Sequence, residues 1–266
     1  MAQSDLHTDP ENYEAGMGGW SKALADKFLE FIGGIKEKNR VLDVGCGTGS
    51  LTSRIAAIYK PSEVIGIDPS TGYVNYARAH NSYPHIKFEI GTAQKLPYSD
   101  GSFDCCLASL IIQFVPDAIA AAKEMKRVTK PHGIVATCMW DNSGGLELAE
   151  RFWRAALAAD PEAKLPSPNQ YGSSSALSEL WTSAGLTVVT TDALVIPIEF
   201  SSFEHLWEVH TKTQGPAKPY ISSLSEDRRH VLKERLRNDL LKGRREGSVR
   251  LHAQAWAVRG LVPVQQ

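Results

Sequence analysis

VLDVGCGTGSLT, residues 41–52, reads as a short buried strand that runs into a glycine-rich turn and then into a helix. Its glycines stand at Gly45, Gly47 and Gly49. The GxGxxG fingerprint of dinucleotide-binding proteins would need a further glycine where this chain has Ser50, and a P-loop would need a lysine after its last glycine. The turn therefore fits neither phosphate-binding motif, although its glycines would let a ligand lie against bare main chain.

Two acidic residues accompany this turn. Asp43 lies within the first strand, and Asp68 ends the next predicted strand. A carboxylate at the second position can accept hydrogen bonds from both hydroxyls of a ribose. The amide N–H groups at the start of the helix can hold the carboxylate of an amino acid. Together these features favour an unphosphorylated nucleoside as the ligand.

Short apolar segments alternate with helical patterns through the first half of the chain. The predicted strands lie at 40–45, 63–68, 86–91, 103–109 and 133–140, and the predicted helices at 20–35, 50–59, 70–80 and 117–130. Such alternation is typical of a doubly wound α/β fold with a mainly parallel sheet. Ligands of such folds bind at the carboxyl ends of the strands.

After Trp140 this alternation stops. Two β patterns follow, at 186–200 and 249–262, and they predict an antiparallel pair that finishes the sheet. The other segments are helical patterns at 146–160 and 176–185, a Pro- and Ser-rich loop at 161–175, and about fifty mostly helical residues between the two β patterns. We expect these insertions to fold over the ligand end of the sheet as a cap.

The run 226–246 is interpreted as a solvated amphipathic helix, with a docking face for an acidic substrate as the alternative. Its predicted apolar face consists of Val231, Leu232, Leu236, Leu240 and Leu241.

The composition is that of an ordinary globular protein, with 266 residues, 42% hydrophobic and 22% charged. A net charge of -1 gives no global field for a polyanion, so we expect no nucleic-acid partner. The polar N-terminus and the short apolar stretches predict a cytoplasmic protein without a membrane segment. No CxxC pair or histidine cluster accompanies the cysteines, which predicts reduced packing residues and no metal site: Cys46, Cys105, Cys106 and Cys138.

Four motifs occur in one order: VLDVGCGTG, VIGIDPS, GTAQKLPYSDGSFD and RVTKPHGIVATCMW. In this respect residues 36–140 resemble the class I S-adenosylmethionine (SAM) dependent methyltransferases, and most of all the small-molecule enzymes related to those of quinone biosynthesis. The resemblance implies a Rossmann-like methyltransferase fold with a seven-stranded, mostly parallel sheet and a helical cap insertion. It also implies an N-terminal helical segment over the cofactor (1–35), a SAM-binding core (36–145), and a C-terminal part (146–266) with cap insertions at about 146–180 and 201–246.

The resemblance also implies a set of cofactor contacts. The glycine loop would flank the methionyl part of SAM, Asp68 would hold the ribose, and the segments after the second and third strands would border the adenine. Many relatives have an aspartate where this chain has Thr92, which is a weaker, neutral acceptor. The implied cofactor residues are Tyr13, Trp20, Asp43, Gly45, Cys46, Gly47, Thr48, Gly49, Asp68, Pro69, Ser70, Thr92, Ala93, Gln94, Ser109 and Leu110.

Substrate contacts are expected from Gln113, after the fourth strand, and from aromatic residues at the sheet end and in the cap. The stretch ASLIIQF lacks the Asn/Asp-Pro-Pro-aromatic motif of the amino-methylating nucleic-acid enzymes, which again disfavours DNA or RNA. The aromatic candidates are Trp140, Trp153, Tyr171 and Trp207, with His210 beside them.

Several of these residues have simpler explanations. Tyr13 and Trp20 would equally serve to pack the first helix, the cap aromatics could form the core of the cap, and Asp68 could be the N-cap of the helix that begins near Ser70. No residue is identified as a catalytic base.

The sequence thus predicts a SAM-dependent methyltransferase that acts on a small molecule as a monomer or homodimer. Two alternatives stay open: a catalytically silent protein of the same fold that serves as a binding or regulatory partner, and an NAD-dependent oxidoreductase, which Ser50 disfavours. The acceptor atom, whether O, N, C or S, is left open.

Overall fold

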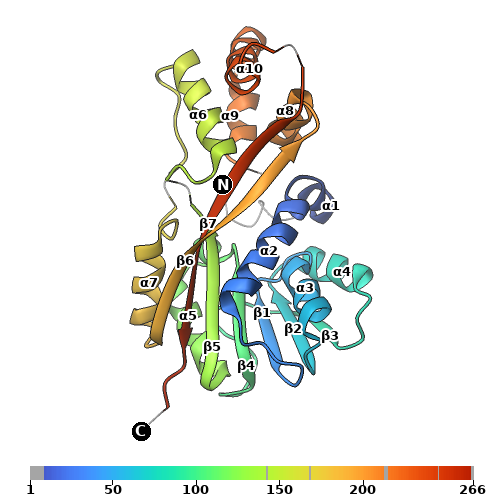
Figure 1. Ribbon diagram of the computed structural model, residues 1–266, viewed down its shortest axis with the longest axis vertical. Coiled ribbons are helices and arrows are strands. Elements are labelled where there is room, and N and C mark those ends of the chain that lie inside the picture. The colour runs from blue at the N-terminus through green and yellow to red at the C-terminus, as the bar shows by residue number, and fades with distance from the viewer. Residues whose placement is uncertain (1–8, 142, 168, 213–214, 245, 265–266) are drawn as a thin grey trace.

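The computed structural model describes residues 9–141, 143–167, 169–212, 215–244 and 246–264. Within them the chain forms a seven-stranded sheet with the strand order β3-β2-β1-β4-β5-β7-β6, flanked by helices (Figure 1). The strands are β1 (Arg40–Val44), β2 (Glu63–Asp68), β3 (Ile86–Ile90), β4 (Phe103–Ser109), β5 (Thr129–Trp140), β6 (Thr187–Phe200) and β7 (Val249–Leu261). The helices are α1 (Pro10–Tyr13), the π-helix η2 (Glu14–Gly18), α2 (Gly19–Ile32), α3 (Ser50–Tyr59), α4 (Thr71–His80), the 3-10 helix η3 (Ile112–Phe114), α5 (Ala118–Val128), α6 (Glu147–Ala159), α7 (Ser174–Ser183), α8 (Phe203–Lys212), α9 (Ala217–Ser223) and α10 (Glu226–Leu241).

Strands β1 to β5 are parallel to their neighbours and are covered on both faces. Apolar residues of α2, α3 and α4 pack on one face, and those of α5 and α7 on the other. Burial on both faces explains why the central strands are almost continuously apolar. The predicted doubly wound fold is confirmed, and the carboxyl ends of β1, β2 and β4 lie at one edge of the sheet.

Strand β5 begins earlier than the predicted residue 133. Thr129 already pairs with Phe103, and the register then shifts before Cys105 pairs with Ile134. His132 lies within this bulge with a φ of 63° and donates its amide to Val262 O at 2.8 Å. A bulge of this kind interrupts the apolar pattern, and for that reason the first residues of β5 escaped the sequence analysis.

The last two strands form the predicted antiparallel pair, with β7 antiparallel to both β5 and β6. Both strands are long, and together they extend past the parallel strands as a two-stranded ribbon (Figure 1). Helices α6, α8, α9 and α10 gather around the far end of this ribbon and form the cap (Figure 1). Helix α7 instead packs on the sheet, where Trp181 Nε1 donates to Val135 O at 2.9 Å, although its residues fall within or next to the first predicted cap insertion.

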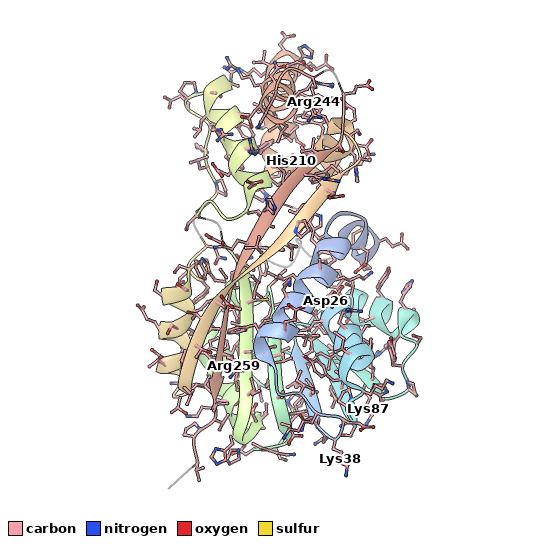
Figure 2. All side chains as sticks on the ribbon, viewed as in Figure 1. Asp26, Lys38, Lys87, His210, Arg244 and Arg259 are labelled. Atoms are coloured by element: carbon pink, nitrogen blue, oxygen red, sulfur yellow. The ribbon has the colours of Figure 1, made fainter. Side chains whose placement is uncertain are left out.

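The cap has an aromatic core of its own. Phe152 contacts the ring of Trp153 at a centroid distance of 5.0 Å and that of His210 at 4.5 Å, and Trp153 lies 5.3 Å from Tyr220. Figure 2 shows His210 among the cap helices. The predicted apolar face of α10 is buried at Leu232, Leu236, Leu240 and Leu241. Val231 was placed on that face wrongly, because its side chain is 45% exposed.

Candidate active site

The turn between β1 and α3 holds all three of its glycines in the left-handed region. Gly45, Gly47 and Gly49 have φ values of 71°, 51° and 89°. A Cβ at Gly45 would lie 2.6 Å from Ile111, and one at Gly49 would lie 2.9 Å from Phe88. A Cβ at Gly47 would have no atom within 4 Å. Gly45 and Gly49 are therefore fixed by packing, while Gly47 turns bare backbone toward open space where a ligand can lie.

Hydrogen bonds tie this glycine loop to β2. The amides of Gly45 and Cys46 both donate to Ile67 O, at 2.7 and 3.1 Å. The Asp68 carboxylate accepts from Gly47 N at 3.0 Å through one oxygen and from Ser70 N at 2.8 Å through the other. Asp68 therefore joins the loops that follow β1 and β2.

Ser70, and not Asp68, is the N-cap residue of helix α4. The Ser70 hydroxyl accepts from Tyr73 N at 3.4 Å, and Ser70 has the extended backbone of an N-cap residue. The simpler explanation for Asp68, as a helix cap, is thus wrong. Asp68 is 7% exposed and lies at the carboxyl end of a central strand, the place where a ribose can be held.

Asp43 is a buried carboxylate with one oxygen that no protein group satisfies. Thr52 Oγ1 donates to Asp43 Oδ2 at 2.6 Å, whereas Oδ1 has no hydrogen-bond partner. Burial raises the pKa of Asp43 to about 7; the hydrogen bond from Thr52 opposes this shift and the charge of Asp68 adds to it. An unsatisfied buried acceptor is costly, so this oxygen is suited to a ligand that brings a donor or a positive charge.

The N-terminal segment reaches the same loop. Glu14 Oε1 accepts from the Thr48 hydroxyl at 2.6 Å. The Tyr13 ring lies 5.9 Å from that of Tyr73 on α4, its hydroxyl bonds Ser21 Oγ at 2.9 Å, and burial raises the pKa of its phenol. Tyr13 thus faces the helix that follows Asp68. The importance of Glu14 was missed by the sequence analysis, because no motif marks it.

Trp20 lies on α2 at a different place. Its ring meets Phe200, at the end of β6, edge-on at a centroid distance of 6.0 Å. This contact agrees with the packing explanation for Trp20, and its cofactor role stays a prediction.

The loop after β4 lies beside the glycine loop and forms another side of the candidate site. Ser109 Oγ lies 3.4 Å from Cys138 Sγ, and Leu110 N donates to Cys138 O at 2.9 Å. Leu110 has a φ of 61°, which is unfavourable for a branched side chain and recurs at functional sites. Because Ile111 packs against Gly45, this loop and the glycine loop lie side by side. Gln113 follows, half-buried, in η3.

On the predicted adenine side, Gly91 N donates to Asp68 O at 3.2 Å and so holds the end of β3 beside the end of β2. Thr92 is exposed, Ala93 is buried and Gln94 is half-buried, while Pro69 is exposed on the neighbouring loop. Pro69 and Thr92, and in part Gln94, are thus accessible to a ligand. The adenine contacts themselves stay predictions.

The predicted substrate residues fall into two groups. Trp140 is buried at the end of β5, and a Cβ at Gly172, next to half-buried Tyr171, would lie 3.4 Å from its carbonyl oxygen. Trp153 and Trp207 instead contact other cap residues; Trp207 stacks on Phe203 at 6.5 Å, and Lys233 Nζ lies 5.8 Å from its ring. The structure thus places Gly172 beside the backbone of Trp140, but the side chains of Trp140 and Tyr171 belong to different apolar clusters. The other two residues lie inside the cap. All four substrate roles stay predictions.

Known protein families and solved structures resemble this chain. Residues 42–137, which include the glycine loop, Asp68 and the loop after β4, match the family described as methyltransferase domain. These residues form a methyltransferase domain. The match confirms the resemblance to class I methyltransferases and favours neither alternative.

Curated relatives match over part of the chain. An uncharacterized methyltransferase of Schizosaccharomyces pombe is 34% identical over 110 residues, covering 38% of this chain and 40% of the relative. A demethylmenaquinone methyltransferase of Staphylococcus aureus is 38% identical over 104 residues, covering 38% of this chain and 43% of the relative. The match spans about two fifths of these relatives' length.

Solved structures share the whole fold. The YcgJ protein of Bacillus subtilis has a TM-score of 0.58 at 17% identity, covering 91% of this chain and 99% of that one. Phosphoethanolamine N-methyltransferase 2 of Haemonchus contortus, solved with SAM, has a TM-score of 0.56 at 17% identity, covering 99% of this chain and 58% of that one. The cyclase SpnF has a TM-score of 0.58 at 20% identity, covering 92% of this chain and 82% of that one. Since one of these neighbours is named a cyclase, the fold alone does not decide the reaction.

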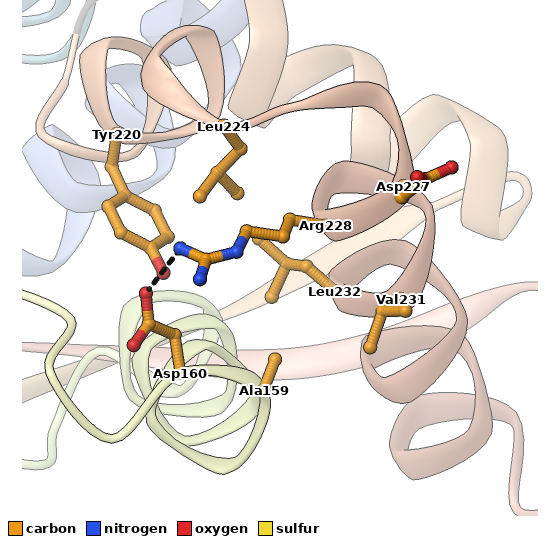
Figure 3. A pocket seen from close by; sticks show the side chains of 8 residues that line it. All are labelled: Ala159, Asp160, Tyr220, Leu224, Asp227, Arg228, Val231 and Leu232. Carbon is orange, nitrogen blue, oxygen red and sulfur yellow. Dashed lines mark hydrogen bonds and ion pairs between the residues drawn. The ribbon is translucent and has the colours of Figure 1, made fainter.

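The cavities found in the cap lie apart from the methyltransferase domain. One of about 160 Å³ lies between the end of α6 and helices α9 and α10, where Arg228 pairs with Asp160 at 3.4 Å (Figure 3). The other, of about 350 Å³, lies where α6, α10 and β7 meet. Its arginines already have protein partners: Arg151 pairs with Asp239, Arg250 with Glu199, and Arg244 Nε donates to Leu241 O.

Among the described residues, no group of three or more His, Cys, Asp or Glu side chains is arranged to hold a metal ion. The four cysteines are free and buried, and burial raises the thiol pKa of Cys105 and Cys138 to about 12. Thiols of this kind are poor nucleophiles. No helix in the described part of the chain is both long and apolar enough to cross a bilayer.

Proposed function

We propose that this chain is a SAM-dependent methyltransferase that methylates a small molecule in the cytoplasm. One observation carries the proposal: Asp68 is buried at the carboxyl end of β2 and accepts from the amide of Gly47, where a Cβ would meet no protein atom, and the buried Asp43 lies near the end of the neighbouring strand β1. The match of this region to the methyltransferase domain family supports the same conclusion.

The residues present fit SAM. Asp68 would accept from the ribose hydroxyls, since it is a carboxylate at the carboxyl end of β2 beside the glycine loop. The open backbone at Gly47 and the start of α3 can receive the methionyl carboxylate. Burial raises the pKa of Cys46 and the nearby carboxylate of Asp43 adds to this shift, so Asp43 lies close to the loop and its negative charge would favour the α-ammonium group.

When bound, SAM supplies a methyl group on a sulfonium, which a nucleophilic acceptor can attack. The protein then has to hold the acceptor in line and exclude water. Leu110 and Ser109 lie at the edge where the loop after β4 meets the glycine loop, and the constrained backbone of Leu110 fixes that wall. Trp140 forms the neighbouring wall at the end of β5. No described side chain is assigned as a general base.

A small acceptor is supported by three features of the chain. Its net charge is -1, it lacks the motif of the amino-methylating nucleic-acid enzymes, and a helical cap stands beyond the strand ends. The name of one relative, demethylmenaquinone methyltransferase, also supports a small-molecule acceptor. We propose that the chain acts as a monomer or homodimer.

Transfer of labelled methyl from SAM tests this function. Purified protein should methylate at least one member of a panel of phenols, carboxylic acids, amines and thiols, and Asp68→Asn should reduce the transfer at least tenfold because a neutral amide holds the ribose less well. Asp192→Asn is the matched control, since it makes the same substitution at an exposed position of the edge strand β6. SAM binding without transfer to any acceptor would favour the silent protein, and NADH binding in place of SAM would favour the oxidoreductase.

A further inference from the structure

The larger cavity of the cap, of about 350 Å³, lies where α6, α10 and β7 meet, outside the residues that match the methyltransferase domain. Among its described lining residues four are cationic and one, Asp239, is acidic. The cationic residues are Arg151, Lys242, Arg244 and Arg250. Because the whole chain has a net charge of -1, this concentration of positive charge is local to the cavity.

The four cations reach the cavity from three segments of the chain. Arg151 lies on α6 and Arg250 on β7, while Lys242 and Arg244 follow the end of α10, where Figure 2 shows Arg244. Lys242 has a φ of 49°, a left-handed conformation that glycine usually takes at the end of a helix. A Cβ at Gly247 would lie 3.3 Å from Arg244 Nη1, so this glycine gives the guanidinium room.

Two of these cations have no acidic partner within the described part of the chain. Lys242 Nζ makes no hydrogen bond or ion pair there, and Arg244 donates through Nε to a carbonyl oxygen, that of Leu241, at 3.2 Å. Two like charges on one cavity repel each other until a counter-charge lies between them. The cavity is therefore suited to an anion.

The other two cations have acidic partners but keep further donors. Arg151 Nη1 pairs with Asp239 Oδ2 at 3.0 Å, and Arg250 Nε pairs with Glu199 Oε1 at 3.0 Å. A guanidinium carries five N–H donors, so each arginine can still donate to a ligand. The Arg250 pair is also exposed, with 77% and 61% of the two side chains accessible, and such pairs are weak.

The floor of the cavity is apolar. It consists of the buried side chains of Leu240, Val249 and Leu251. An apolar floor beside cationic side chains suits an organic anion better than an inorganic one, because the organic part can rest on the floor. The volume of about 350 Å³ is that of a small-molecule site.

We propose that this cavity binds a small organic phosphate, with the phosphoryl oxygens on Lys242 and Arg244 and the organic part on the apolar floor. A phosphate monoester carries close to two negative charges at neutral pH, which matches the two cations without acidic partners. The guanidinium of Arg244 can hold two phosphoryl oxygens at once through Nη1 and Nη2, and Lys242 adds a point charge. This site lies outside the methyltransferase domain, so the proposal goes beyond the proposed function and does not depend on it.

The competing explanation is that these cations only keep the surface of the cap solvated. Any exposed cation of the cap would then attract an anion equally well. Calorimetric titration of phenyl phosphate at low salt into four proteins separates the two explanations: the wild type, Lys242→Gln, Arg244→Gln and Arg235→Gln. Arg235 is the matched control, because it is an exposed arginine of α10 that does not line the cavity.

We expect the wild type to bind phenyl phosphate with a submillimolar dissociation constant. Lys242→Gln and Arg244→Gln should each weaken this binding about tenfold or more, as for loss of a charged hydrogen bond, and Arg235→Gln less than about twofold. Inorganic phosphate, which lacks the organic part, and phenol, which lacks the phosphoryl group, should both bind the wild type more weakly than phenyl phosphate. Thermal unfolding checks that the variants are folded, and since the three substituted side chains are exposed, the midpoint should stay unchanged.

Wild-type protein that does not bind phenyl phosphate would overturn the proposal. Equal weakening by Arg244→Gln and Arg235→Gln would overturn it as well, because the attraction would then belong to the whole surface of the cap. Inorganic phosphate that binds as tightly as phenyl phosphate would contradict the role given to the apolar floor. None of these outcomes bears on SAM binding, so failure here is distinguishable from failure of the proposed function.

Discussion

At the scale of single residues, Asp43 couples the site to pH. Burial raises its pKa to about 7, so in the free protein the carboxyl is largely protonated at mildly acidic pH. An ammonium ligand binds the ionised form, and its binding should release a proton near neutral pH. We expect the affinity for S-adenosylhomocysteine to rise about tenfold between about pH 6 and about pH 8.

Calorimetry across this pH range, in two buffers of different ionisation enthalpy, measures both the affinity and the released proton. Asp43→Asn should bind more weakly and lose the pH dependence. 5′-Methylthioadenosine is the matched control ligand, because it has no ammonium group to favour the ionised carboxyl. A flat profile for S-adenosylhomocysteine with the wild type would contradict the role given to Asp43.

Gly45 and Gly47 should respond differently to one added methyl group. Gly45→Ala places a Cβ against Ile111 and should lower stability by about 2 kcal/mol or more. Gly47→Ala meets no protein atom, so it should cost only the roughly 1–2 kcal/mol of a left-handed alanine, yet block the cofactor. Thermal unfolding and SAM titration of both variants check this; unimpaired SAM binding by Gly47→Ala would show that the ligand lies elsewhere.

At the scale of elements, the cap has an acid-sensitive position. His210 on α8 packs on Phe152 of α6, and its Nε2 is buried without a partner. Burial lowers its pKa from 6.5 to about 4. Because the folded pKa lies below the unfolded one, its contribution to stability is full above about pH 6.5 and is lost as the pH falls toward about 4.

We therefore expect the wild type to lose on the order of 2 kcal/mol more stability between about pH 7 and about pH 4.5 than His210→Leu loses. His205→Leu, on the same helix but exposed, is the control and should behave like the wild type. Hydrogen exchange of cap amides at both pH values would locate the change. Equal acid sensitivity of the wild type and His210→Leu would contradict the prediction that protonation of His210 destabilises the cap.

The loop elements show which parts of the site a sequence can reveal. The glycine loop and Asp68 were predicted, because backbone conformation and strand ends leave local patterns. Glu14 was not, because its bond to Thr48 joins positions that no periodicity relates. The same holds for Ser70, whose capping role depends on one hydroxyl contact with Tyr73 N.

At the scale of the whole molecule, the mainly parallel sheet followed from the apolar patterns of its strands, since buried parallel strands must be apolar on both faces. The spatial order of the strands was not predicted. The cap was predicted as an insertion, but its internal packing was not. Contacts such as Phe152 with His210 join segments that lie far apart in the chain, and the sequence held no signal for that pairing. From the sequence, Trp153 and Trp207 were candidates for the substrate site, with packing in the cap core as the favoured explanation for each.

The most direct test of the central claim is calorimetric titration of SAM into the purified wild-type chain, with NADH titrated in parallel. The open face of Gly47, whose amide bonds the buried Asp68, predicts micromolar binding of SAM, no binding of NADH, and a marked loss of SAM affinity in Asp68→Asn. Folded wild-type protein that does not bind SAM would contradict the account.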